Sequence, residues 1–380
     1  MKLLQEFRSA SRARTLTEKI RQLPIDKARL MEVCGTHTMA IHRAGIPEAL
    51  PSSVQLLSGP GCPICVTPRR YIDQAIELAT AYKVTVATFG DLVRVPGSKL
   101  SLEKARSSGA DVRVVYSGLE AVELARMEPE RRVCFLGIGF ETTAPTVAAS
   151  ILEARRNRLK NFFVLSAHKL IPPALRTLAQ GPEVDIDGLI LPGHVSTIIG
   201  TRPYEFLPEE FSLSCVVAGF EPVDILQAIW MLLIQRVENQ PRLECQYSRA
   251  VRPEGNPKAL EVMNRVFERT GATWRGFGRI PDSGLVIRKE FGEFDASRVF
   301  ELAAGESAED PRCLCPSVLR GVKVPPDCPL FGKSCTPENP IGACMVSSEG
   351  TCAAYYRYRA MPVKSGSRTG LTQSGGVVTR

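Results

Sequence analysis

The feature that most constrains this chain is the alternation of apolar runs and helical stretches between residues 54 and 220. Such short, β-rich runs separated by helices are typical of parallel strands whose two faces are both covered by helices. The pattern therefore predicts an α/β protein built on parallel sheets. The runs are 54–57, 84–89, 112–116, 133–138, 162–165, 188–191 and 215–218.

A weak internal repeat divides this region. Residues 84–91, followed by a Val-Pro pair, resemble residues 162–169, followed by an Ile-Pro pair. The repeat predicts two similar parallel-sheet α/β units, at 47–133 and 134–221, that meet near residue 133. A chain of 380 residues is long enough for further domains.

Three segments lie outside the repeat. Residues 1–46 contain amphipathic helical patterns and a motif around Cys34, and we expect them to pack with the C-terminal domain. Residues 222–362 predict a mixed α+β domain. Residues 363–380 are rich in Ser, Gly and Thr, which predicts a disordered tail.

A Cys-x-x-Cys pair, Cys62 and Cys65, lies between an apolar run and a helical pattern. Thr67 is a suitable N-cap and Pro68 suits a first helical turn, so both sulfurs are expected just outside a helix N-terminus. That position favours the thiolate, which binds metals or attacks sulfur. The alternative is a pair of small buried residues in a turn.

Other residues with chemically active side chains recur where the predicted strands end. Because ligands gather at the carboxyl ends of parallel strands, we expect several of them to line one cleft. Cys34 and His37 also lie near a predicted helix start, although this spacing alone is a weak metal signal. The strand-end residues are Cys62, Cys65, Asp91, Arg94, Glu141, Thr142, Thr143, His168, Lys169, His194 and Glu221.

Six of the twelve cysteines fall near the C-terminus, at positions 313, 315, 328, 335, 344 and 352. Prolines and glycines separate them, so the segment can bury little apolar surface and needs a metal to organise it. Cys328, Cys335, Cys344 and Cys352 lack the paired knuckles of a zinc ribbon, and their spacing favours an iron–sulfur cluster over zinc. Cys313 and Cys315 provide either extra ligands or a redox relay.

Composition excludes several function classes. The net charge of +8 comes from scattered residues, and no basic run is interleaved with aromatic residues, so no nucleic-acid partner is expected. No apolar run is long enough to span a membrane, and the N-terminus lacks a signal-peptide core. We therefore expect a cytoplasmic protein, in which twelve cysteines indicate metal or thiol chemistry rather than a disulfide scaffold.

The motifs together resemble those of the HypD family of hydrogenase maturation factors. The resemblance covers about residues 30 to 358. The residues that carry it are 31–38, 59–65, 89–91 with 94–97, 139–145, 191–195 and 342–347.

This resemblance implies a scaffold that builds the Fe(CN)2CO group of [NiFe] hydrogenase together with a HypC-type chaperone and a HypE-type cyanide donor. By motif, Cys34, Cys62 and Cys65 would be the iron-site and thiol-chemistry residues. The resemblance favours an assembly scaffold over an independently turning-over enzyme. It also implies a [4Fe–4S] cluster on Cys328, Cys335, Cys344 and Cys352.

His37 is a candidate hydrogen-bond donor to a thiolate or to an iron-bound diatomic group. Asp91, Glu141 and His194 are candidates for proton transfer or for a partner surface. Two other functions explain part of the pattern. A general thiol–disulfide oxidoreductase fed by an iron–sulfur cluster would leave Cys34 and His37 without a role. An interaction protein with structural zinc would account for the C-terminal cysteines only.

Overall fold

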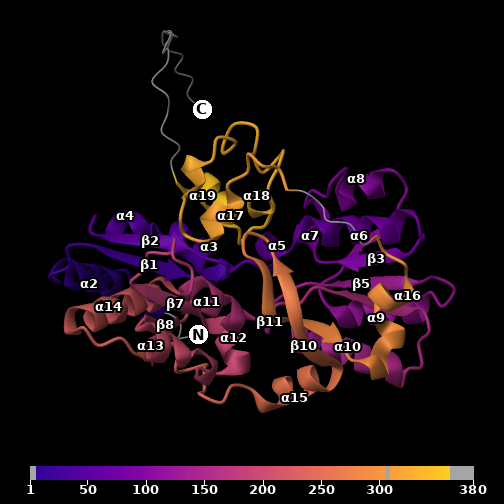
Figure 1. Ribbon diagram of the computed structural model, residues 1–380, viewed down its shortest axis with the longest axis horizontal. Helices are drawn as coiled ribbons and strands as arrows, with labels where there is room; N and C mark the ends of the chain where they lie inside the picture. Colours follow the sequence, from indigo (N-terminus) through magenta and orange to yellow (C-terminus); the bar gives the residue numbers. More distant parts are fainter. Residues whose placement is uncertain (1–5, 304–308, 360–380) are drawn as a thin grey trace, which may run out of the picture.

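The computed structural model describes residues 6–303 and 309–359, so the predicted tail at 363–380 lies outside the described residues. Two parallel sheets and one antiparallel hairpin form the framework. In Figure 1, sheet A lies on the left and sheet B on the right, with the hairpin between them and the yellow C-terminal segment at the top. The predicted α/β class with parallel sheets is confirmed.

Sheet A has five parallel strands in the order β2-β1-β7-β8-β9. Because β1 has β2 on one side and β7 on the other, the chain changes direction across the sheet at β1, which creates a crevice at the carboxyl ends of these strands. The bounds are β1 Ala28–Glu32, β2 Val54–Ser58, β7 Gly188–Pro192, β8 Ser214–Ala218 and β9 Leu243–Cys245.

Helices cover both faces of sheet A, so its inner strands β7 and β8 are buried along their whole length. One face packs against α2, α3, α4 and α14, and the other against α11, α12 and α13. The bounds are α2 Ala10–Arg21, α3 Gly35–Arg43, α4 Ile46–Ala49, α11 Ile171–Ala179, α12 Gly193–Ile199, α13 Phe206–Phe211 and α14 Pro222–Glu238.

Sheet B has four parallel strands in the order β4-β3-β5-β6. Helices α9, α10 and α15 pack on one face, and α6, α8 and α16 pack on the other. The bounds are β3 Thr85–Thr88, β4 Val112–Val114, β5 Val133–Gly137, β6 Phe162–Ser166, α6 Arg69–Thr80, α7 Gly90–Val93, α8 Leu102–Ser107, α9 Gly118–Met127, α10 Ala144–Arg156, α15 Pro257–Val266 and α16 Ala296–Val299.

The hairpin pairs β10 (Phe267–Trp274) with β11 (Gly278–Ile287). Beyond it, described residues 309–359 contribute short helices but no strand to either sheet. These helices are α17 Cys315–Leu319, α18 Ala343–Val346 and α19 Thr351–Tyr358.

Every predicted apolar run is a strand, but the grouping of strands about residue 133 is wrong. Strand β2 pairs with β1 in sheet A, whereas β3 to β6 form sheet B as one block between β2 and β7. Residues 28–32, expected within an N-terminal helical region, form the inner strand β1, between β2 and β7. Among the described residues, no helix combines the length and apolarity needed to cross a membrane.

Candidate metal and thiol centre

The loops that follow β1 and β2 lie side by side at the carboxyl edge of sheet A. Glu32 and Ser58 are in register at the ends of the two strands. Beyond them, the backbone N–H of Gly35 donates to the carbonyl of Gly61 at 2.8 Å. A Cβ at Gly61 would lie 2.1 Å from the nitrogen of Cys34, so only glycine permits this approach. The Cys34 loop and the Cys-x-x-Cys loop are therefore fixed against each other.

Cys62 and Cys65 lie at the start of and within the single turn of α5 (Pro63–Val66), and they are joined by a disulfide, with their Cα atoms 5.2 Å apart. Cys62 is the N-cap of α5, and Cys65 lies inside its single turn. Both cysteines precede α6, the helix that was predicted to start after Thr67, so their place before that helix agrees with the prediction. Thr67 ends α5, and the longer α6 starts only after Pro68. The local sequence makes two helices where we expected one.

Cys34 is the N-cap of α3 and is buried. Its backbone N–H donates to the carboxylate of Glu32 at 2.9 Å, and the Thr38 hydroxyl donates to the same carboxylate. Burial raises the pKa of Cys34 to about 12 and that of Glu32 to about 8. The protein alone thus favours the thiol at Cys34, and a bound cation would be needed to hold the thiolate.

Two predicted histidines come together across an aromatic ring. His37, from α3, stacks on Phe220 with ring centroids 4.7 Å apart, and His194, from α12, stacks on Phe220 at 3.8 Å. His37 Nε2 lies 2.9 Å from the Gly219 carbonyl, so this nitrogen carries the proton and donates. Its buried Nδ1 has no partner among the described residues, and burial lowers the pKa of His37 to about 4.

Asp91 does not lie at the carboxyl edge of sheet A, but the C-terminal segment connects it to that edge. Its carboxylate accepts from the backbone N–H and the hydroxyl of Ser348, at 3.1 and 3.0 Å. The neighbouring Glu349 accepts from the Thr36 hydroxyl at 2.6 Å. The turn at Ser348 and Glu349 thus ties the end of β3 in sheet B to the Cys34 loop in sheet A.

Glu141 occupies a different place, at the edge of sheet B. Its buried carboxylate accepts from the backbone N–H of Ile171 at 2.9 Å, and its second oxygen has no partner among the described residues. Burial raises the pKa of Glu141 to about 7. It lines a cavity with Arg269 that contains none of the predicted cysteines. The predicted strand-end residues therefore lie at two sheet edges, and they do not line one cleft as expected.

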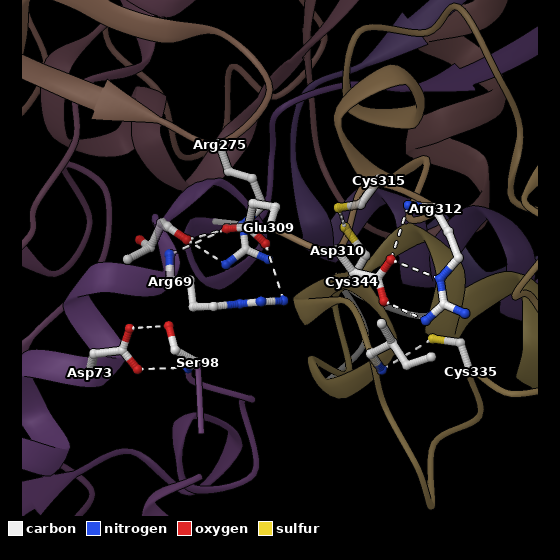
Figure 2. A network of polar contacts seen from close by, with 12 residues as sticks. Arg69, Asp73, Ser98, Arg275, Glu309, Asp310, Arg312, Cys315, Cys335 and Cys344 are labelled. Carbon is white, nitrogen blue, oxygen red and sulfur yellow. Dashed lines mark hydrogen bonds and ion pairs between the residues drawn. The ribbon is translucent and has the colours of Figure 1, made fainter. Parts of the chain in front are cut away.

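The six C-terminal cysteines line one small cavity, which is closed by apolar side chains such as Leu330 and Met345. Within it, the sulfurs of Cys315 and Cys344 lie 2.6 Å apart. This contact, together with burial, raises the pKa of Cys315, and burial raises the pKa of Cys313 to about 12. Figure 2 shows Cys315 and Cys344 pointing toward each other, with Cys335 farther along the segment.

The donor set of this cavity suits an iron–sulfur cluster, because soft thiolates in a dry pocket are its usual ligands. In the part of the chain that the structure describes, no three or more His, Cys, Asp or Glu side chains already stand in a geometry that could share one metal ion. Cys313 and Cys315 line the same cavity as the four predicted ligands, so all six thiols are within one enclosure.

The two cysteine groups are neighbours. Helix α18, which carries Cys344, packs against α5, which carries Cys65. Cys62, Cys65, Cys315 and Cys344 all belong to one continuous apolar core. Helix α19 packs against α3, beside the Cys34 loop.

Sequence reasoning missed three residues of this centre. Glu32 directly follows the apolar pair Leu30 and Met31 and is buried at the end of β1, which is an unusual place for a carboxylate and could have marked it. Phe220 follows β8 and resembles an ordinary core residue. Glu349 has no sequence signal, because its contact with Thr36 spans most of the chain.

Comparisons with known proteins agree with the motifs. The model of the family described as "HypD: Hydrogenase formation hypA family" matches residues 11–359. The hydrogenase expression/formation protein HupD of Azotobacter chroococcum mcd 1 is 49% identical over 367 residues, covering 94% of this chain and 97% of that protein.

The hydrogenase maturation factor HypD of Azotobacter vinelandii is also 49% identical over 367 residues, with the same shares of both chains. A putative hydrogenase expression/formation protein of Methanocaldococcus jannaschii is 45% identical over 345 residues, covering 90% of this chain and 96% of that protein.

Proposed function

Because the chain belongs to the HypD family, we propose that it acts in hydrogenase maturation as the scaffold on which iron receives its cyanide and carbonyl ligands. The observation that carries the proposal is the contact between the Cys34 loop and the Gly61-Cys62 loop. This contact supports a site where three sulfurs, distant in sequence, act on one iron atom. Iron is here the cargo of the protein.

Cys34, Cys62 and Cys65 are the proposed iron and thiol residues. Soft thiolates suit low-spin iron that carries diatomic ligands. Burial of all three side chains excludes water from that iron. Opening the Cys62–Cys65 disulfide takes up two electrons and two protons and yields two thiols, which lose their protons again when they bind metal.

A resident [4Fe–4S] cluster, held by Cys328, Cys335, Cys344 and Cys352, would relay the two electrons one at a time from an external one-electron reductant. Cys315 is the proposed relay, with Cys313 beside it. The 2.6 Å contact between the sulfurs of Cys315 and Cys344 and the packing of α18 on α5 support a short route from this cavity to Cys65.

The proposed partners are a HypC-type chaperone, which shares the iron, and a HypE-type protein, which delivers cyanide. His37 and His194 face each other across Phe220 at the same sheet edge, so they are the proposed proton-handling groups beside the iron. Asp91 and Glu349 tie the C-terminal segment to this edge. We place this work in the cytoplasm, where thiols stay reduced.

Infrared spectroscopy of the complex co-purified anaerobically with the chaperone tests the proposal. Wild type should give cyanide and carbonyl stretches on iron. In Cys34→Ala these stretches should vanish while cluster absorption survives. The matched control is Cys245→Ala, a half-buried cysteine on β9 outside both groups, which should keep both signals. Stretches of wild-type intensity in Cys34→Ala would remove Cys34 from the iron site.

A general thiol–disulfide oxidoreductase is not favoured. Such enzymes present one sulfur to a protein substrate, whereas Cys62 is 4% exposed and Cys65 is fully buried. It would also leave the fixed Cys34 loop without a role.

A further inference from the structure

A cavity of 560 Å³ lies apart from the cysteine loops, between α6, the end of β6 and the β10–β11 hairpin. This volume falls within the range of pockets for organic ligands. Apolar surface comes from Tyr71, Ala167, Trp274 and Pro316. The strand-end residues His168 and Lys169, which the proposed function does not use, also line it.

Lys169 brings a buried positive charge to this cavity. The residue is 3% exposed, and its ammonium donates to the Thr273 carbonyl at 2.9 Å. That carbonyl is its only hydrogen-bond partner among the described residues, so donor capacity remains. Burial lowers the pKa of Lys169 to about 8, which is the cost of a buried ammonium without a carboxylate.

Two arginines add to this charge. The buried Nε of Arg70 has no hydrogen-bond partner among the described residues. Arg275 is 6% exposed and donates to the Thr67 carbonyl at 2.9 Å. Figure 2 shows Arg275 and Arg69 converging on Glu309, whose carboxylate lies 3.3 Å from Arg275 Nε. Among the described residues that line the cavity, Glu309 is the one carboxylate, against the three cations Arg70, Lys169 and Arg275.

A second polar group is also left without a partner. The Nε2 atom of His168 is buried and has no hydrogen-bond partner among the described residues, while its Nδ1 lies 3.1 Å from the Ser166 hydroxyl. Buried polar groups are normally paired, so His168 and Arg70, which both line the cavity, each keep one buried nitrogen with unused hydrogen-bonding capacity.

We propose that this cavity binds an organic anion, with its carboxylate or phosphate head between Lys169 and Arg70 and its apolar body against the Trp274 side of the hairpin. Guanidinium and ammonium groups are the residues that proteins use for such heads. The proposal uses none of the proposed iron residues, although the cavity adjoins both cysteine groups through Pro68 and Pro316. Because Arg275 holds both Thr67 and Glu309, an anion here would also compete with Glu309 for Arg275.

Calorimetric titration of the full-length protein at constant ionic strength tests this site. The probes are benzoate, phenyl phosphate and the uncharged benzamide, which share one ring and differ in the head. We expect at least one of the two anions to bind and benzamide not to bind. The tighter of the two identifies the head as carboxylate or phosphate. In Lys169→Met and in Arg70→Gln, affinity should fall about tenfold or more, because a charge-assisted hydrogen bond is lost.

Arg70 is only partly buried on α6, so Arg70→Gln tests the site even if Lys169→Met does not fold. The matched controls are Lys104→Met on α8 and Arg126→Gln on α9, both exposed and remote from the cavity lining, and they should bind like wild type. The proposal is overturned if neither anion binds, if benzamide binds as well as the anions, or if Arg70→Gln keeps wild-type affinity.

Discussion

The Cys34 and Cys62 loops are extensions of two paired parallel strands, whereas the six C-terminal cysteines come from a segment that adds no strand to either sheet among its described residues. Backbone hydrogen bonds and a glycine contact position the first group. The second group is held by short helices, turns and contacts between its own thiols. From this difference we expect the backbone of the sheet to position the first group, and the ligand of the thiols to organise the second.

The largest effect should follow the loss of a sulfur from the second group. In Cys344→Ala we expect loss of the cluster, because Cys344 lies at the centre of the sulfur contacts. Residues 309–359 should then become sensitive to limited proteolysis. Visible absorption and mass spectrometry of the fragments measure both effects, and Cys245→Ala serves as the control. Normal cluster content in Cys344→Ala would show that Cys344 is not a ligand.

The same comparison predicts that backbone contacts within the fold hold the Cys34 and Cys62 loops in place. Gly61→Ala would push a methyl group into the backbone of Cys34, and backbone cannot move aside as a flexible side chain can. We expect a loss of about 3–4 kcal/mol in the free energy of unfolding, at the upper end for overpacking. Urea denaturation measures it. Gly90→Ala is the control, since the nearest atom to its new Cβ would lie 3.7 Å away. Equal stability of the two variants would contradict a close contact at Gly61.

Glu141, which lies at the edge of sheet B and away from the cysteine centre, should make the free energy of unfolding depend on pH. Its pKa is raised to about 7 by burial, so the protonated form stabilises the fold at low pH. The contribution of the protonated Glu141 to the free energy of unfolding is about 3 kcal/mol. It is fully present below about pH 4.5 and is lost as the pH rises through 7.

Glu141→Gln mimics the protonated carboxyl group and cannot ionise. The variant should therefore not lose this stability as the pH rises. As the pH rises from 5 to 8, the free energy of unfolding of the variant should therefore increase by about 3 kcal/mol relative to that of wild type. Urea denaturation of both proteins across that range measures the difference. If the two proteins respond to pH identically, the pKa of Glu141 is the same in the folded and unfolded states, and its elevation is refuted.

We expect the smallest effect from the hydrogen bond that connects the Cys34 loop to the C-terminal segment. Thr36→Val removes the hydroxyl that donates to Glu349 and should lower stability by about 1 kcal/mol. Hydrogen exchange should increase at α19 and little elsewhere. Thr80→Val, which removes an exposed hydroxyl within α6, is the control. Unchanged exchange at α19 would mean that the segment docks without this contact.

The sequence allowed all four strands of sheet B to be predicted, and β2, β7 and β8 of sheet A, because runs of apolar residues are a local property. Strands β1 and β9 were missed, since β1 lies next to a helical pattern and β9 is short and lies in a polar segment. The sequence did not allow the prediction of which strands pair, since β2 joins β1 through contacts that periodicity does not encode. The cysteines and histidines were predictable from residue type and position. Glu349 and Phe220 were not, because only the tertiary fold brings them to Thr36 and His37.

Mössbauer spectroscopy of the chaperone complex, grown on isotopically enriched iron, tests the central claim most directly. The account predicts two iron environments in wild type, one from the cluster and one from a low-spin iron at the sheet A edge. Cys34→Ala should lose only the second, and Cys344→Ala should lose the cluster. A low-spin iron signal that is undiminished in Cys34→Ala, or a wild-type complex without iron, would contradict it.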